Sequence, residues 1–135
     1  MFNVEKVTND CIQWIRDWRE ENGPGCNFIV GISGGVDSLV AAELCVEAIG
    51  ADKVLGVIMP NREQDDIDVA YDICQYVLGI DYLTINVGSA YDNIIDQMDL
   101  AFNVTDQTLI NLAPRLRMAT LYGVSQSHNG RVVNT

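Results

Sequence analysis

The chain has 135 residues, which is the size of one domain with a substantial buried core. With 48% hydrophobic and 20% charged residues it is not an intrinsically disordered chain, and no apolar run approaches the roughly 20 residues of a membrane-spanning helix. The formal net charge of -11 argues against a nucleic-acid partner, because such proteins need clusters of lysine and arginine.

The cysteines and the N-terminus predict a cytoplasmic protein. Cys11, Cys26, Cys45 and Cys74 form no Cys-x-x-Cys pair and no Cys/His cluster with metal-ligand spacing. We therefore interpret all four as small buried hydrophobic residues in a reducing compartment. The first residues lack the basic start and apolar middle of a signal peptide, so we expect neither export nor membrane attachment.

The predicted elements are one helix followed by strands that alternate with helices. Apolar residues at three- and four-residue spacing predict an amphipathic helix over 4–21. The next elements predicted in chain order are a strand at 28–32, a tight loop at 33–38, a helix at 39–49, a strand at 54–59, a helix at 65–78, a strand at 82–87 and a helix at 89–102. A long helix, capped by Asp106 or Thr108, then runs to about 127, and a last strand begins at 131–133.

This alternation predicts an α/β fold with an open parallel sheet and helices on both faces. Ligands of such sheets bind at the carboxyl ends of the strands, where the strand order reverses. Little chain follows the fourth strand, so we expect the domain over 1–135 to be incomplete at its C-terminal end.

The loop at 33–38, Ser-Gly-Gly-Val-Asp-Ser, predicts a phosphate site. Its two glycines let the backbone approach a ligand closely, and the amides and dipole of the following helix favour an anion. Ser33 and Ser38 add hydroxyl donors. Asp37 would repel phosphates unless a cation lay between them, which predicts Mg²⁺, an ion that binds one or two carboxylates together with phosphate oxygens.

Two other interpretations of this loop are open. A glycine-rich turn with a capping side chain would need no ligand. The pattern Gly31-x-Ser33-x-Gly35 also fits the nucleophile elbow of the α/β-hydrolases, with Ser33 as nucleophile. A serine hydrolase would need a histidine, and His128, the one histidine present, is expected at a solvated helix end. We favour the phosphate site over both.

The loop resembles the pyrophosphate-binding loop of the N-type ATP pyrophosphatases, and the whole sequence resembles the ammonia-dependent NAD synthetases. The likeness covers essentially all 135 residues and lies in the stretches 31–38, 55–60, 111–118 with 121–122, and 132–135. It implies a Rossmann-like fold of the adenine nucleotide alpha hydrolase type, and an ATP-pyrophosphatase-type nucleotide-binding domain. It also implies a homodimer for the complete protein.

The resemblance implies ATP-dependent amidation of nicotinic acid adenine dinucleotide (deamido-NAD) to NAD. ATP adenylates the carboxylate, pyrophosphate leaves, and ammonia then displaces AMP, with no protein nucleophile. The implied ATP-binding residues are Gly31, Ile32, Ser33, Gly34, Gly35, Val36, Asp37, Ser38 and Thr135. Asp37 would also bind Mg²⁺, Arg115 would contact deamido-NAD, and Gln64 matches a position that can touch nucleotide in relatives.

The sequence also departs from the family's pattern. Pro114 precedes Arg115, which predicts a kinked helix unless the proline lies in the first turn, and Asn134 stands where glycine is common. Arg115 and Arg117 diverge by about 200° on a helix, so we expect Arg115 to face the ligand and Arg117 to form a salt bridge. Members of this family are longer, so a non-catalytic ATP-binding fragment is the alternative function.

Overall fold

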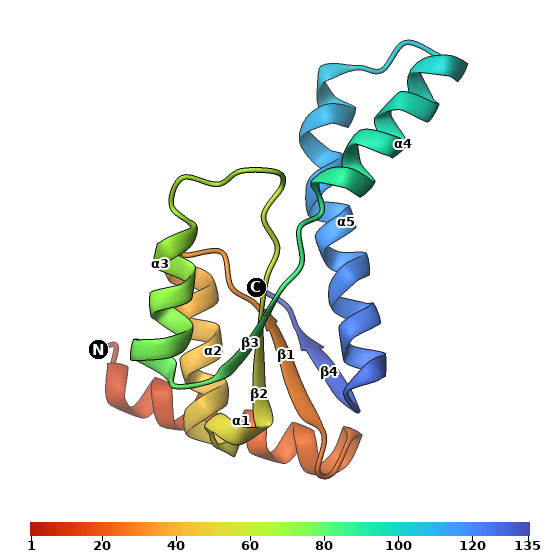
Figure 1. Ribbon diagram of the computed structural model, residues 1–135. Helices are drawn as coiled ribbons and strands as arrows, with labels where there is room; N and C mark the ends of the chain where they lie inside the picture. The colour runs from red at the N-terminus through yellow and green to blue at the C-terminus, as the bar shows by residue number, and fades with distance from the viewer.

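The computed structural model describes all residues, Met1–Thr135. Four parallel strands form one sheet in the order β3-β2-β1-β4 (Figure 1). Their bounds are β1 (Asn27–Gly31), β2 (Val54–Ile58), β3 (Asp81–Thr84) and β4 (Gly130–Val133). The chain steps outward from β1 to β3 and then returns to the other side of β1, so the strand order reverses between β1 and β4.

One face of the sheet is covered by the first three helices (Figure 1). These are α1 (Val4–Asn22), α2 (Val36–Ile49) and α3 (Ile67–Asp72), which continues as the π-helical segment η2 (Ile73–Leu78), while a short 3-10 turn η1 (Ala51–Lys53) leads into β2. The buried side chains of α2, α3 and η2 pack on Phe28, Val30 and Ile32, and α1 adds the partly buried Ile15 and Trp18. Burial raises the pKa of the Cys45 and Cys74 thiols to about 11, so both stay protonated at neutral pH as the core interpretation requires.

The opposite face is covered by α5 (Asp106–Ser127), whose Leu121 and Val124 pack on Ile29 and Val57. Helices on both faces of a parallel sheet confirm the predicted fold class. The helix α4 (Gly88–Ala101) and the first turns of α5 form a hairpin that projects away from the sheet (Figure 1). No helix is both long enough and apolar enough to cross a membrane.

The first helix differs from the predicted amphipathic packing. No residue of α1 is buried, Cys11 is exposed, and the side chain of Trp14 keeps 65% of its surface open. Only the end of the predicted stripe, around Trp18, packs on the core. Arg16 instead docks α1 by donating from Nε to the carbonyl of Ala48 at 2.8 Å, at the C-terminus of α2 where a cation is favoured.

Three observed element boundaries also differ clearly from the predicted ones. The helix α2 begins at Val36, inside the predicted loop, and β3 ends at Thr84 because the chain then leaves the sheet toward α4. The cap of α5 is neither predicted residue but Thr105, whose side chain accepts from the Thr108 amide at 3.3 Å. Pro114 therefore lies in the interior of α5, and the helix continues across it.

Candidate functional site

A cavity of about 580 Å³ opens at the carboxyl ends of β1, β2 and β4, where the strand order reverses. This is the position at which open parallel sheets bind their ligands. The lining residues come from the three strand ends and from the face of α5 above them: Gly31, Ile32, Ser33, Met59, Asn61, Glu63, Gln64, Pro114, Arg117, Met118, Leu121, Val133, Asn134 and Thr135.

The loop after β1 is held together by its own serines. The Ser38 hydroxyl lies 3.2 Å from that of Ser33, accepts from the Ser33 amide, and lies within donating distance of the Gly35 carbonyl. The Ser33 hydroxyl also accepts from the Gly35 amide at 3.2 Å. Ser38 is buried and its hydroxyl is committed inside the loop, so Ser38 shapes the loop, while Ser33 is exposed and lines the cavity.

Backbone donors gather where this loop opens α2. Gly34 has φ +90°, a conformation that side chains disfavour and that turns the chain sharply into the helix. The first hydrogen bond into the helix is donated by Leu39 to the Gly35 carbonyl at 3.3 Å. The amides of Val36, Asp37 and Ser38 therefore precede the helical ladder, and such a helix start attracts an anion.

Asp37 lies in the first turn of α2 with an exposed carboxylate. No group of three or more histidine, cysteine, aspartate or glutamate side chains is placed to hold a metal ion. This donor set does not suit an ion held by protein ligands alone, but it fits Mg²⁺, which takes one or two carboxylates together with phosphate oxygens. Asp37 is the residue that would hold such an ion here.

The helix α5 turns Arg117 toward the cavity and Arg115 away from it. Arg117 donates from Nε to the carbonyl of Met59 at 2.8 Å, at the end of β2, and forms no salt bridge, so its predicted ion pair was wrong. Arg115 is exposed and does not line the cavity; it lines a depression that adjoins the cavity and shares Pro114 and Met118 with it. The two arginines diverge as predicted.

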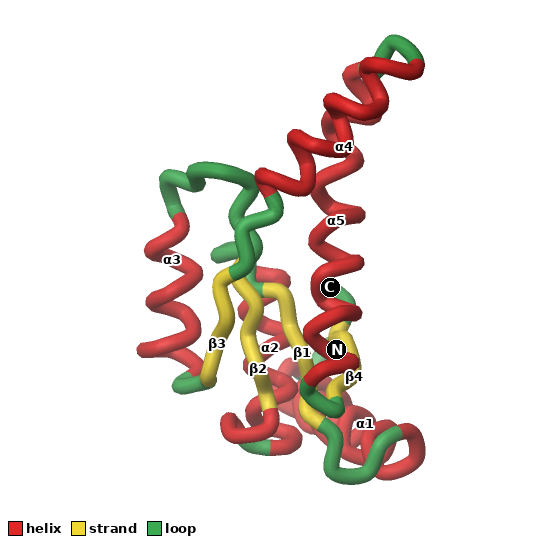
Figure 2. The backbone as a smooth tube through the Cα atoms, turned by 45° about the vertical axis from the view of Figure 1, so that its right-hand side comes forward, coloured by secondary structure: helices red, strands yellow, loops and turns green.

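The loop after β2 forms another wall of the cavity through Asn61, Glu63 and Gln64. Between them Arg62 adopts φ +67°, which is unusual for a residue other than glycine. The buried Oδ1 atom of Asn61 accepts no hydrogen bond from the protein. Figure 2 shows this loop beside the segment that leads from β3 into α4, and the Val87 amide donates to the Pro60 carbonyl at 2.9 Å between them.

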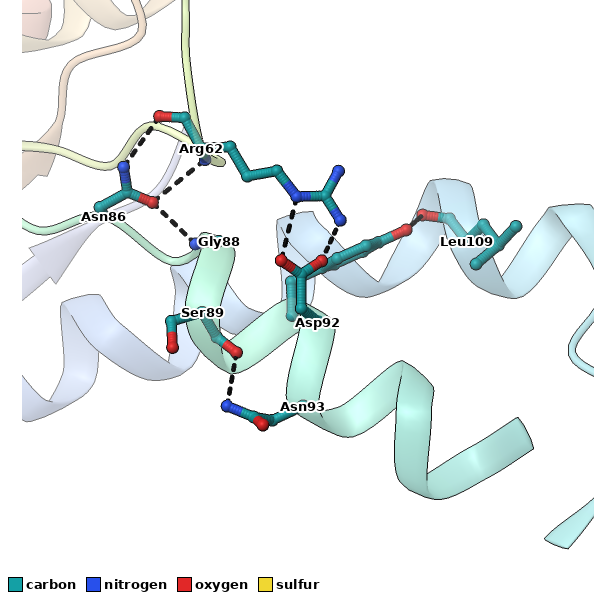
Figure 3. Close-up of polar contacts among 8 residues, drawn as sticks. Arg62, Asn86, Gly88, Ser89, Asp92, Asn93 and Leu109 are labelled. Atoms are coloured by element: carbon teal, nitrogen blue, oxygen red, sulfur yellow. Dashed lines mark hydrogen bonds and ion pairs between the residues drawn. The ribbon is translucent and has the colours of Figure 1, made fainter. Parts of the chain in front are cut away.

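We call the contacts of Arg62 with these neighbours the Arg62 clasp (Figure 3). The Arg62 amide donates to Oδ1 of Asn86 at 3.1 Å, and Nδ2 of Asn86 donates back to the Arg62 carbonyl at 2.8 Å. Its guanidinium forms an ion pair with Asp92, in which Nε lies 3.1 Å from Oδ2, and stacks 5.6 Å from the centre of the Tyr91 ring. The contact leaves no room for a side chain at Gly88, because a Cβ there would lie 2.6 Å from the backbone nitrogen of Arg62.

The ion pair gives stability a defined pH dependence. Hydrogen bonding from Arg62 and its charge hold the pKa of Asp92 below its usual value. The pair therefore stabilises the protein above the ordinary aspartate pKa of about 3.9, and this contribution is lost as the pH falls through the lowered pKa. We expect Asp92→Asn to unfold at a lower temperature than wild type at pH 7, and this gap to narrow as the pH falls below about 3.9 and to close below the lowered pKa of Asp92. Thermal unfolding by circular dichroism measures it, and a gap independent of pH would contradict it.

The serine hydrolase interpretation was wrong. His128 lies beside the start of β1, because the Asn27 side chain donates to the His128 carbonyl at 2.7 Å. Ser33 follows the other end of the same strand, about 16 Å away for five strand residues. Nδ1 of His128 lies 2.8 Å from the Val124 carbonyl, so this histidine belongs to a helix end.

The predicted residues are thus only partly brought together. Gly31, Ile32, Ser33, Gln64 and Thr135 line the cavity. The residues 34–38 build and open the loop, and Arg115 faces elsewhere. The prediction missed Met59, Asn61, Glu63, Arg117 and Met118, and named Asn134 only as a departure. For α5 a signal existed, because Pro114, Arg117 and Met118 share one helical face with the buried Leu121.

Residues 7–135 match the family model described as NAD synthase. The NH(3)-dependent NAD(+) synthetase of Thermococcus kodakarensis is 40% identical over 132 residues, which cover 98% of this chain and 49% of that protein. The chain therefore spans about half the length of the curated relatives it matches.

Solved structures show the same likeness. The NH3-dependent NAD synthetase from Campylobacter jejuni, in complex with the nitrate ion, superposes with a TM-score of 0.87 and 29% identity, covering 100% of this chain and 57% of that one. The glutamine-dependent NAD+ synthetase from Acinetobacter baumannii, in complex with ADP, gives 0.87 and 25%, covering 98% and 25%. These matches confirm the resemblance drawn from the sequence, and the chain belongs to the NAD synthase family.

Proposed function

We propose that this chain supplies the ATP-binding part of an enzyme that converts deamido-NAD to NAD with ammonia. The nicotinate carboxylate attacks the α-phosphorus of ATP, the bond to the β-phosphate breaks, and pyrophosphate leaves. Ammonia then attacks the adenylated carbonyl carbon, the bond to AMP breaks, the attacking nitrogen loses a proton to solvent, and the amide remains. The family supports ATP-dependent NAD formation in general, and the relative bound to ADP supports an adenine nucleotide as ligand.

The observation that carries the proposal is the loop at the switch point. Amides of Val36 and Asp37, the dipole of α2 and the exposed Ser33 hydroxyl converge beside a cavity of nucleotide size. These groups hold and orient phosphate oxygens, so catalysis rests on positioning and electrostatic stabilisation. Ser33 acts as a hydrogen-bond donor with no nucleophilic role. Mg²⁺, held by Asp37, would neutralise charge on the phosphates.

Further parts of the site belong to the same proposal. Thr135 and Gln64 line the cavity and would contact ATP, and Arg115, in the adjoining depression that shares Pro114 and Met118 with the cavity, would contact deamido-NAD. We further propose a homodimer of the complete protein through the α4–α5 hairpin. Leu100 and Ile110 there expose 82% and 68% of their surface. Analytical ultracentrifugation tests this, and a monomer at all concentrations would contradict it.

Replacing Asp37 by alanine tests the metal. Titration calorimetry of the wild-type chain is expected to show tighter binding of ATP with Mg²⁺ than without it. In Asp37→Ala this difference should disappear, and affinity in Mg²⁺ should fall by about tenfold or more. Asp96→Ala is the matched control, because Asp96 is exposed on α4 and forms no salt bridge. An unchanged Mg²⁺ dependence in Asp37→Ala would contradict the assignment.

Isotope exchange between ATP and pyrophosphate separates the ligase from the non-catalytic fragment. A ligase that adenylates its substrate exchanges pyrophosphate into ATP only when deamido-NAD is present. A fragment that only binds ATP shows calorimetric binding without exchange. Ammonia and glutamine, compared as nitrogen donors, then identify the donor of the second step.

A further inference from the structure

Beyond the groups that touch ATP, the Arg62 clasp joins two walls of the cavity. The loop wall at 61–64 is attached through Arg62 to Asn86 and Asp92, at the start of α4. The Arg62 guanidinium stacks over the Tyr91 ring. The Tyr91 hydroxyl in turn donates a hydrogen bond to the Leu109 carbonyl of α5 at 2.7 Å. The same helix carries the wall formed by Pro114, Arg117 and Met118.

The loop at 61–64 also contains two energetically unfavourable features that neighbouring contacts must stabilise. Arg62 occupies a left-handed conformation that a glycine would adopt freely, and the neighbouring Asn61 holds a buried oxygen without a donor. Unusual backbone and unpaired polar atoms persist where the surroundings fix them, and they gather at functional sites. Here the surroundings that fix them are the contacts of the clasp.

We propose that Arg62 is a positioning residue for ATP binding, through the clasp that fixes the 61–64 wall against α4 and α5. This inference rests on the proposed function, because it presupposes ATP in the cavity. Arg62 itself does not line the cavity and reaches the ligand only through its neighbours Asn61 and Glu63. Without the clasp, the loop at 61–64 has more conformational freedom before ATP binds. ATP binding must then order this loop, and the entropy lost on ordering weakens the affinity.

The experiment measures ATP affinity in Mg²⁺ by calorimetry for the wild-type chain and four clasp variants. Arg62→Gly keeps the left-handed turn and the two backbone hydrogen bonds with Asn86 but removes the guanidinium, so it tests the side-chain contacts of the clasp with the backbone conformation preserved. Arg62→Gly and Asp92→Asn are each expected to lower affinity by about threefold to tenfold. The double variant should lose no more than the larger single loss, because both changes break one linkage. Arg62→Lys keeps the charge without the two-pronged geometry and should recover part of the loss.

A second exposed ion pair provides the control. Lys6 and Asp10 on α1 pair at 2.6 Å, far along the chain from the cavity residues, and Lys6→Ala should leave ATP affinity unchanged. Wild-type affinity in Arg62→Gly and Asp92→Asn, with stability lowered or not, would overturn the inference and leave the proposed function standing. Failure of the wild-type chain to bind ATP would instead overturn the proposed function, and the inference with it. Circular dichroism identifies any variant that does not fold. If Arg62→Gly or Asp92→Asn does not fold, the ATP affinity of Arg62→Lys is compared with wild type: a partial loss supports the inference, and wild-type affinity overturns it.

Discussion

Replacing Ile29 by alanine is expected to lower the free energy of unfolding by about 3 to 4 kcal/mol. Ile29 is 0% exposed and lies in the central strand, where it packs against Val57 and Leu121 between the sheet and α5. Truncation removes three methyl or methylene carbons and leaves a void that β1, paired on both sides, cannot close.

Urea denaturation followed by circular dichroism measures this loss. Val40→Ala is the control, since Val40 is a β-branched residue on α2 that keeps 51% of its surface exposed. Its substitution should change the free energy of unfolding by no more than about 0.5 kcal/mol. A loss below about 1 kcal/mol for Ile29→Ala would show that the two layers do not pack through β1 as described.

Gly34→Ala is expected to weaken ATP binding by about tenfold and to lower the free energy of unfolding by about 1 to 2 kcal/mol. A Cβ at Gly34 would meet nothing closer than 3.7 Å, so crowding is not the cause. The cause is the φ of +90°, which an alanine adopts only with strain. Relief of that strain would turn the loop and misdirect the amides that follow it.

Gly123→Ala is the matched change with the opposite sign. Gly123 lies inside α5, its φ is not positive, and a Cβ there would meet nothing within 4 Å. Alanine should therefore stabilise the helix by about 0.5 to 1 kcal/mol and leave ATP affinity unchanged. Calorimetry and urea denaturation of both variants test the pair, and equal effects of the two substitutions would contradict the role given to Gly34.

The predicted order of elements held because most of them carry strong local signals. Short β-branched runs marked β1 and β2, and glycines or proline marked their ends. The prediction for the first helix was wrong because the spacing of its apolar residues predicted a buried face, whereas Trp14 is exposed. Periodicity shows which side of a helix is apolar, but it does not show whether another element covers that side.

The cavity was predicted well on its β1 side and poorly on the others. The loop at 33–38 encodes its own turn through Gly34 and its own hydrogen bonds through Ser33 and Ser38. The conformation of the loop at 61–64 depends on contacts with Asn86 and Asp92, which lie more than twenty residues away in the sequence. No local sequence pattern therefore predicts this wall of the cavity. Arg117 was misassigned because its role follows from Leu121, which orients α5 only once the helix is packed.

The strand order also dictates a sequence of events during folding. One edge of β1 pairs with β2, which follows it closely in the chain, whereas the other edge pairs with β4, and the bond from Asn27 to His128 joins residues 101 positions apart. Closing so long a loop costs more chain entropy than closing a short one, and such distant contacts slow folding. We therefore expect the edge of β1 that pairs with β4 to stay open during synthesis until α4, α5 and β4 have followed.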